Sequence, residues 1–298
     1  MRDSINDSTN KTNEEVINKD KKAQQTVFIG EEFVLPFRPF ELNNEYSVLC
    51  TIEKGEHVET LKQNYKVRRL RPDTDQNDYH FIQIDKISEL LIDGKPADLA
   101  VHKVAEKTAQ FLFPIRIVVD KYGKWVDLNS YDKLKERWEK QKDEIEDAYE
   151  GEVYDTIVDN IEKAIIDDDT LIESLSGNWF LRAFFNGIHI AYTEKLKIEK
   201  NIFFPAIAEM DDLEFLLSQK AEPYLNDLNL IEVTQEGELE NEYLEGFFNA
   251  RYFLNPNHYN IESLELECNL IEIKEKISIK VDNLNESKID FHSISLLV

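Results

Sequence analysis

Apolar and polar residues alternate along two separate parts of the chain. In the first part the alternating runs are 45–54, 65–72, 79–87, 111–120 and 124–129, and in the second they are 231–235, 245–254, 262–273 and 276–284. A period of two is typical of a β-strand with one buried face, and the short turns between runs predict antiparallel meanders. Residues 33–40 contain two prolines, so we expect an edge or irregular segment there.

Between these parts the period lengthens to that of a helix. The apolar positions with helical spacing are Tyr131, Leu134, Trp138, Ile145 and Tyr149, followed by Val153, Ile157, Ile161 and Ile165. They predict two amphipathic helices, the first with Ser130 as its N-cap. The aspartates at 167–169 predict the start of a third, short helix that ends at Gly177.

Four further segments are interpreted one by one. Residues 188–193 alternate and predict a strand after a switch at Asn186-Gly187, whereas 211–229 predict helix or loop. Residues 91–110 contain an Asp-Gly turn and leave a hairpin tip, a strand and a short helix open. We interpret 113–140 as a structural junction in which Ile115, Ile117 and Val119 face the core, Gly123 makes the turn and Trp138 points inward.

Strands, then helices, then strands predict an α+β fold with antiparallel, curved sheet(s) and a central helical insertion. We expect residues 1–26 to be a disordered polar tail. Residues 27–298 then form a single α+β domain, with strands in 45–129, helices in 130–186 and strands in 187–298. Two β-rich domains joined by the helices are the alternative.

Acidic residues are concentrated in two segments. The 298 residues include 60 acids and 35 bases, a net charge of −25. Residues 131–175 hold 16 acids and 6 bases, and residues 209–246 hold 12 acids and one base. Such surfaces repel nucleic acids and anionic membranes, and they attract a basic partner. Acidity that only keeps the protein soluble is the simpler interpretation.

Motifs for ions are incomplete. Asp73, Asp75 and Asn77 match the first EF-hand ligands, but Asp78 replaces the required glycine and Ile84 the required glutamate, which favours a polar hairpin loop. The 167–169 aspartates are better explained as a helix cap than as a cation site. No two of the six histidines have ligand spacing, so no zinc site is expected. We expect His189 and His258 to be core or rim groups.

Motifs for catalysis and cofactors are missing. The chain has no GxSxG, GxGxxG or P-loop pattern. Cys50 and Cys268 lie in predicted strands and are interpreted as core thiols. We therefore predict a protein that is not an enzyme and has no cofactor, metal or catalytic residue, although acids are too abundant for a carboxylate pair to stand out.

Aromatic residues gather in 178–205. The cluster comprises Trp179, Phe180, Phe184, Phe185, Phe203 and Phe204. It suits either a pocket for an apolar ligand or a core between helix and sheet, and we expect the core.

Four pieces of the chain, IRIVVDKYGKWVDL, YDKLKERW, FLRAFFNGI and NIFFP, resemble a group of uncharacterised β-rich proteins of Bacteroidetes. The resemblance covers about residues 45–284 and implies a half-barrel sheet with a helical insertion. It carries no functional motif and hence no site residue. That group is mostly exported, whereas the start of this chain lacks the apolar region of a secretory signal.

These observations predict a bacterial protein-interaction component, such as an immunity, adaptor or secretion-system-associated protein, that binds a basic protein. The predicted contact residues are Glu144, Glu146, Asp147, Glu150, Asp155, Asp159, Asp167, Asp168 and Asp169. The alternative is a carrier of a small apolar ligand or lipid in a half-barrel cavity. No window of 18 apolar residues occurs, so we expect no membrane span and a cytoplasmic location. The oligomeric state stays open.

Overall fold

The computed structural model describes residues 26–27, 33–71, 78–96, 99–129, 131–146, 151–207 and 211–285. The strands are β1 Asn43–Lys54, β2 His57–Leu70, β3 Tyr79–Lys86, β4 Leu91–Ile92, β5 Lys95–Pro96, β6 Ile115–Asp120, β7 Trp125–Leu128, β8 Lys197–Phe204, β9 Leu213–Ala221, β10 Ile231–Leu239, β11 Gly246–Leu254, β12 Ile261–Leu270 and β13 Glu275–Asn283. The α-helices are α1 Ala100–Thr108, α2 Tyr131–Glu146, α3 Glu152–Ala164, α4 Asp168–Ser176 and α5 Trp179–Phe184, and the 3-10 helices are η1 Pro39–Glu41 and η2 Ala109–Leu112.

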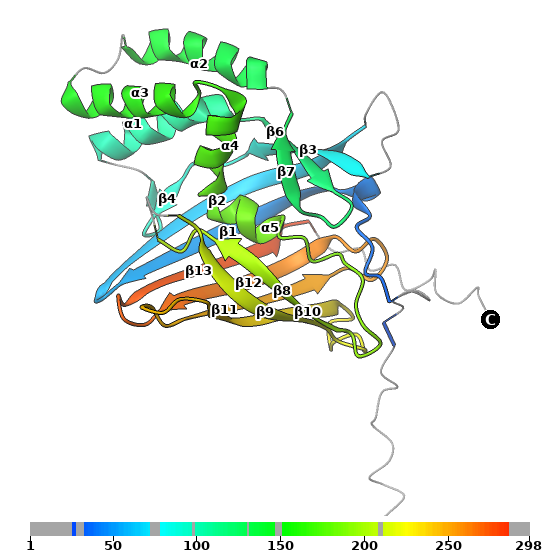
Figure 1. Ribbon diagram of the computed structural model, residues 1–298. Coiled ribbons are helices and arrows are strands. Elements are labelled where there is room, and N and C mark those ends of the chain that lie inside the picture. Colours follow the sequence, from blue (N-terminus) through cyan, green and yellow to red (C-terminus); the bar gives the residue numbers. More distant parts are fainter. Residues whose placement is uncertain are drawn as a thin grey trace, which may run out of the picture.

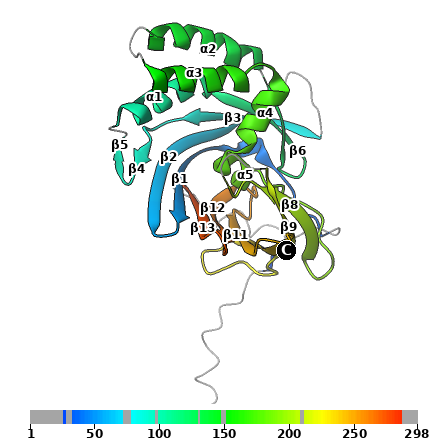
Figure 2. The same cartoon turned by 60° about the vertical axis from the view of Figure 1, so that its left-hand side comes forward.

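The described strands form one 13-stranded sheet in which neighbours pair antiparallel. Its main order is β7-β6-β3-β2-β1-β13-β12-β11-β10-β9-β8, and the small β4–β5 hairpin attaches to β2. The first and last long strands meet in the middle, with Cys50 opposite Ile279. Strands from both ends of the chain therefore share one sheet, which curves without closing (Figure 1, Figure 2). The predicted α+β class with an antiparallel curved sheet and a helical insertion is confirmed.

Alternation along each strand decides which side chains line the inner face. In β11, Phe248, Ala250, Tyr252 and Leu254 are buried and the residues between them are more exposed. The same period places Ile115, Ile117 and Val119 of β6 in the core, as predicted. Gly123 makes the following turn with φ +75°. Ser130, the predicted N-cap of α2, lies outside the described residues.

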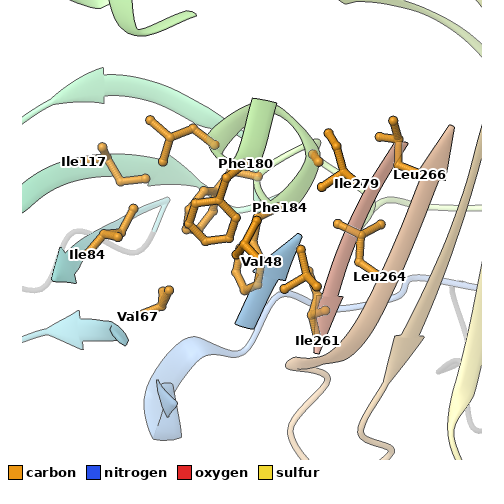
Figure 3. Packing of buried hydrophobic residues seen from close by; sticks show 14 of the residues in the cluster. Val48, Val67, Ile84, Ile117, Phe180, Phe184, Ile261, Leu264, Leu266 and Ile279 are labelled. Carbon is orange, nitrogen blue, oxygen red and sulfur yellow. The ribbon is translucent and has the colours of Figure 1, made fainter. Parts of the chain in front are cut away.

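Helix α5 lies inside the curve of the sheet. Figure 3 shows Phe180 and Phe184 between Val67, Ile84 and Ile117 of one half and Leu264, Leu266 and Ile279 of the other. The Phe180 ring stacks on Tyr65 at 4.8 Å between centroids, and the Phe184 ring meets the edge of Tyr46 at 4.9 Å. Such aromatic pairs add to the burial of apolar area, so α5 joins both halves into one core.

Two predictions about the second half were wrong. Residues 211–229 were expected to be helix or loop, yet Leu213–Ala221 is strand β9, whose inward residues include Phe215, Leu217 and Gln219. A glutamine at an inward position and an adjacent Leu216-Leu217 pair hide the period of two. Residues 188–193 were expected to be a strand, but in the described structure they form only an isolated bridge, Val34 with Ala191. Segment 91–110, left open above, forms the β4–β5 hairpin and then α1.

Candidate functional site

The four helices α1, α2, α3 and α4 form a layer that we call the helical cap. It stands over one end of the sheet, and α4 leads down to α5 (Figure 1). Trp138 of α2 is fully buried and contacts the ring of Phe111 at 5.2 Å between centroids. The Tyr131 hydroxyl donates to the carbonyl of Ile165 at 2.6 Å, which ties the start of α2 to the end of α3. The inward direction predicted for Trp138 is confirmed.

The predicted contact residues lie on the surface of this cap wherever the structure describes them. Exposed on α2, α3 and the start of α4 are Glu144, Glu146, Asp155, Asp159, Asp167, Asp168 and Asp169. The other two, Asp147 and Glu150, lie outside the described residues. Asp167 is the N-cap of α4, since its carboxylate accepts from the Thr170 N–H at 2.8 Å, and this bond lowers the pKa of Asp167. The predicted cap is confirmed, and Gly177 follows the last turn.

Charge is not uniform over the cap. Residues 131–142, at the start of α2, hold five bases and three acids, whereas residues 143–175 hold 13 acids and one base. One ion pair, Lys142 with Glu162, joins the two regions. The acidic surface is therefore that of α3, α4 and the end of α2, a narrower region than the sequence segment 131–175.

An apolar groove of about 320 Å³ lies between α1, α3 and α4. Its walls include Ala105, Ile157, Ile161, Leu171 and Leu175. The next residue after the groove-lining Ile165 is Ile166, which is 67% exposed. Sequence reasoning assigned the isoleucines to packing only. Their half-buried positions at 157 and 161 could not be separated from full burial by periodicity.

The second acidic segment, 209–246, does not join the cap. It contributes to β9 and β10, away from α2 and α3 (Figure 1). Several of its acids have partners: Asp212 pairs with Arg182 at 2.7 Å and Glu232 with Arg251 at 2.8 Å. The two segments are thus separate surfaces, and the second is partly neutralised.

The inner face of the sheet is occupied by protein side chains. Phe180, Phe184, Phe185 and Phe204 are buried, which confirms the core interpretation for these four, while Phe203 is 52% exposed. A polar network lies beside them. Gln235 donates to Gln219 at 2.7 Å, and Asn186 donates to Gln235 at 2.8 Å. An apolar ligand on this face would have to displace α5.

Buried polar groups complete the interior. His189 is buried, its Nδ1 lies 3.1 Å from the Pro36 carbonyl, and burial lowers its pKa to about 3. It is a neutral core group, as predicted, and His258 is half-buried at the rim. Cys50 and Cys268 are buried free thiols, and burial raises the pKa of each to about 12. The EF-hand-like Asp73, Asp75 and Asn77 lie outside the described residues.

Within the described ranges the structure offers neither a cluster of metal ligands nor a membrane-spanning helix. In them, no three His, Cys, Asp or Glu side chains gather in a way that could hold a metal ion. None of the helices there combines the length and the apolar character needed to cross a bilayer. No protein-family model matches the chain, and no curated protein does.

Proposed function

We propose that this protein is a non-catalytic interaction component, of the adaptor, immunity or secretion-associated kind, whose helical cap binds a basic segment of another protein. The observation that carries the proposal is the position of the apolar groove beside the acidic part of the cap. Either feature alone is common on protein surfaces. Together they match a partner with one apolar and one cationic face.

Charge and groove would contribute differently. Exposed acids such as Asp155, Asp159 and Asp168 attract a cationic partner and raise its association rate, more so at low salt. Apolar side chains of the partner would then enter the groove at Ile157 and Ile161 and slow its dissociation. Helix α1 supplies the third wall and carries Lys103 and Lys107, so the cationic face should turn toward α3 and α4.

A direct test uses a peptide of leucine and lysine in a helical repeat, and the same peptide with glutamate in place of lysine. We expect the lysine peptide to bind and the glutamate peptide not to bind, with affinity falling steeply as salt rises. Replacing Asp155, Asp159 and Asp168 together by asparagine should weaken binding about tenfold at low salt.

A matched control removes the same charge elsewhere. Glu236, Glu238 and Glu240 are exposed in and just after β10, and we expect their replacement by glutamine to change affinity less than about twofold. Equal losses for both triple variants would mean unspecific attraction and would contradict the proposal. The same variants should then be compared as baits in native lysate at low and high salt.

The alternative of an apolar-ligand carrier has less support. Helix α5 and the Gln219–Gln235–Asn186 network occupy the inner face that such a ligand would need. Native mass spectrometry of freshly purified protein would detect a co-purifying lipid and so favour the carrier.

A further inference from the structure

The two end strands of the sheet, β7 and β8, are bridged by a segment of irregular chain. We call this segment, Phe185–Tyr192, the plug, and the gap that it fills the seam. On the β7 side the Trp125 N–H donates to the Phe185 carbonyl at 3.2 Å, and the His189 N–H to the Tyr122 carbonyl at 3.2 Å. On the other side Lys200 of β8 donates to the Gly187 carbonyl at 3.2 Å, and Gln219 to the Ile188 carbonyl at 3.0 Å.

A cavity of about 580 Å³ opens at the seam. Its lining comes from both end strands, from α4 and α5, and from the plug, and includes Lys124, Trp125, Arg182, Ile190 and Lys200. The site is therefore assembled from segments far apart in sequence. The lining combines aromatic and aliphatic side chains with cationic ones.

The acids of the cavity are already engaged. Asp212 pairs with Arg182 at 2.7 Å. Asp120 accepts from the backbone N–H groups of Tyr122 and Lys124, both at 2.9 Å, and so holds the β6–β7 turn. Each carboxylate thus has a structural partner.

The two lysines of the cavity differ in that neither has a carboxylate partner among the described residues. Among the described residues, no carboxylate lies within ion-pairing distance of the Lys124 or Lys200 ammonium. Burial, with a smaller effect from Lys124, lowers the pKa of Lys200 to about 8. Lys200 is still mostly protonated at pH 7, so the cavity holds a partly desolvated positive charge that has no carboxylate partner.

We propose that the seam cavity binds a small organic anion, with its carboxylate or phosphate group between Lys124 and Lys200 and its apolar body against Trp125 and Ile190. An anion would supply the counter-charge that the protein does not. A neutral apolar ligand would leave both ammonium groups unpaired, and nucleic acid is disfavoured by the net charge of −25. The proposal does not depend on partner binding by the helical cap.

The first test is calorimetric titration with inorganic phosphate, benzoate, naphthalene-2-carboxylate and the uncharged naphthalene-2-carboxamide. We expect the naphthalene carboxylate to bind most tightly of the four and the carboxamide to bind at least about tenfold more weakly. Absence of binding by all the anions at millimolar concentration would overturn the proposal. Equal affinity for carboxylate and carboxamide would overturn it as well.

Variants locate the site. Lys200→Met and Lys124→Met keep the aliphatic stem and remove the charge, and each should weaken carboxylate binding about tenfold. Lys197→Met is the matched control, since Lys197 is an exposed residue of the same strand that pairs with Glu199 at 3.7 Å. Its effect should stay below about twofold. A loss with Lys197→Met equal to that with Lys200→Met would place the anion elsewhere.

A pH series separates charge from packing. Carboxylate affinity should fall as pH rises through about 8, where Lys200 loses its proton, and this dependence should disappear in Lys200→Met. The charged groups around Lys200 are Lys124, Arg182, Asp120 and Asp212. A pH dependence that persists unchanged in the folded Lys200→Met protein would overturn the role given to Lys200. The peptide assay of the cap should be unaffected by these variants, so the two proposals can fail separately.

Discussion

The helical cap and the seam differ in the sign of their charge and in how exposed that charge is. On the cap, acids such as Asp155 and Asp159 extend from exposed helix faces. At the seam, Lys200 reaches into a cavity and bonds to the backbone of the plug. Charges on the cap can therefore change with little effect on the fold, whereas those at the seam are coupled to the packing of the plug between the end strands.

This difference follows from how each region meets its backbone hydrogen bonds. In the helices of the cap, backbone N–H and C=O groups pair within each helix, so the outer side chains do not have to supply hydrogen bonds to the backbone. The end strands of the sheet cannot, because β7 and β8 do not pair with each other among the described strands. At the seam, the plug and polar side chains such as Gln219 supply the hydrogen bonds, so polar groups are buried between the end strands.

The largest effect is expected for Gly123→Ala at the seam. Gly123 has φ +75°, and an added Cβ would lie 2.7 Å from Cδ2 of His189, which is buried in the plug. Backbone strain of about 1 kcal/mol and overpacking of about 1–3 kcal/mol should lower the free energy of unfolding by roughly 2–4 kcal/mol in urea titration.

Gly55→Ala is the control for backbone strain alone. Gly55 has φ +61° in the β1–β2 turn, and nothing lies within 4 Å of its added Cβ. The expected loss is about 1 kcal/mol. If both variants lost the same free energy, the contact between the β6–β7 turn and the plug would not contribute to stability.

Tyr252→Phe should have the next largest effect. The buried Tyr252 hydroxyl donates to the Ala183 carbonyl at 3.0 Å and accepts from Asn186 at 3.1 Å. Its removal leaves buried polar groups with fewer partners, at a cost of about 1–2 kcal/mol in the free energy of unfolding. The control is Tyr122→Phe, because Tyr122 is 43% exposed and should lose less than about 0.5 kcal/mol. If Tyr252→Phe lost as little free energy of unfolding as Tyr122→Phe, water would have to satisfy the Ala183 and Asn186 groups that the hydroxyl leaves unpaired.

Lys200→Met should stabilise the protein while it weakens anion binding. Burial lowers the pKa of Lys200 from 10.5 to about 8, so the charged amine costs stability at every pH below 8. The unfolded chain binds more protons between about pH 8 and 10.5, so wild-type stability rises relative to the variant across that window. Because the side chain is only half-buried and the Gly187 bond is lost, we expect a gain of about 1 kcal/mol at pH 7.

Urea titrations at pH 7 and pH 10 measure this difference. The gain should shrink at the higher pH. A variant that is less stable than the wild type at pH 7 would show that Lys200 is a structural group, and it would contradict the desolvation cost assigned to its charge.

Much of the fold could be predicted because it rests on local periodicity. Alternation located β11, β12 and β13, and the four-residue spacing of Ile157, Ile161 and Ile165 located α3. Strand β9 was missed because its inward residues include Gln219, and the plug was mistaken for a strand because 188–193 also alternate. Both errors fall at the seam, where burial of polar side chains breaks the usual relation between pattern and burial.

The sites were predictable to different degrees. The acids of the cap could be found by counting charges, and a finer count along the sequence also separates the basic start of α2 from the acidic α3. The seam cavity had no sequence signal, since Lys124, Arg182 and Lys200 come from segments that only the curved sheet brings together. A lysine in a strand normally indicates the exposed face. The desolvation of Lys200 depends on the plug, whose position could not be predicted from the pattern of apolar residues.

The smallest effect on stability is expected on the cap, for Asp159→Asn. Asp159 is exposed on α3, one helical turn from the like charge of Asp155 and from the opposite charge of Lys163. Such pairs contribute about 0.2–0.5 kcal/mol each and here oppose one another, so the free energy of unfolding should change by less than about 0.3 kcal/mol. Asp159→Lys attracts Asp155 and repels Lys163, so the two effects again oppose one another and the free energy of unfolding should also change by less than about 0.3 kcal/mol. A loss above about 1 kcal/mol in either variant would mean that this acid supports the helix itself, and the cap would then resemble the seam.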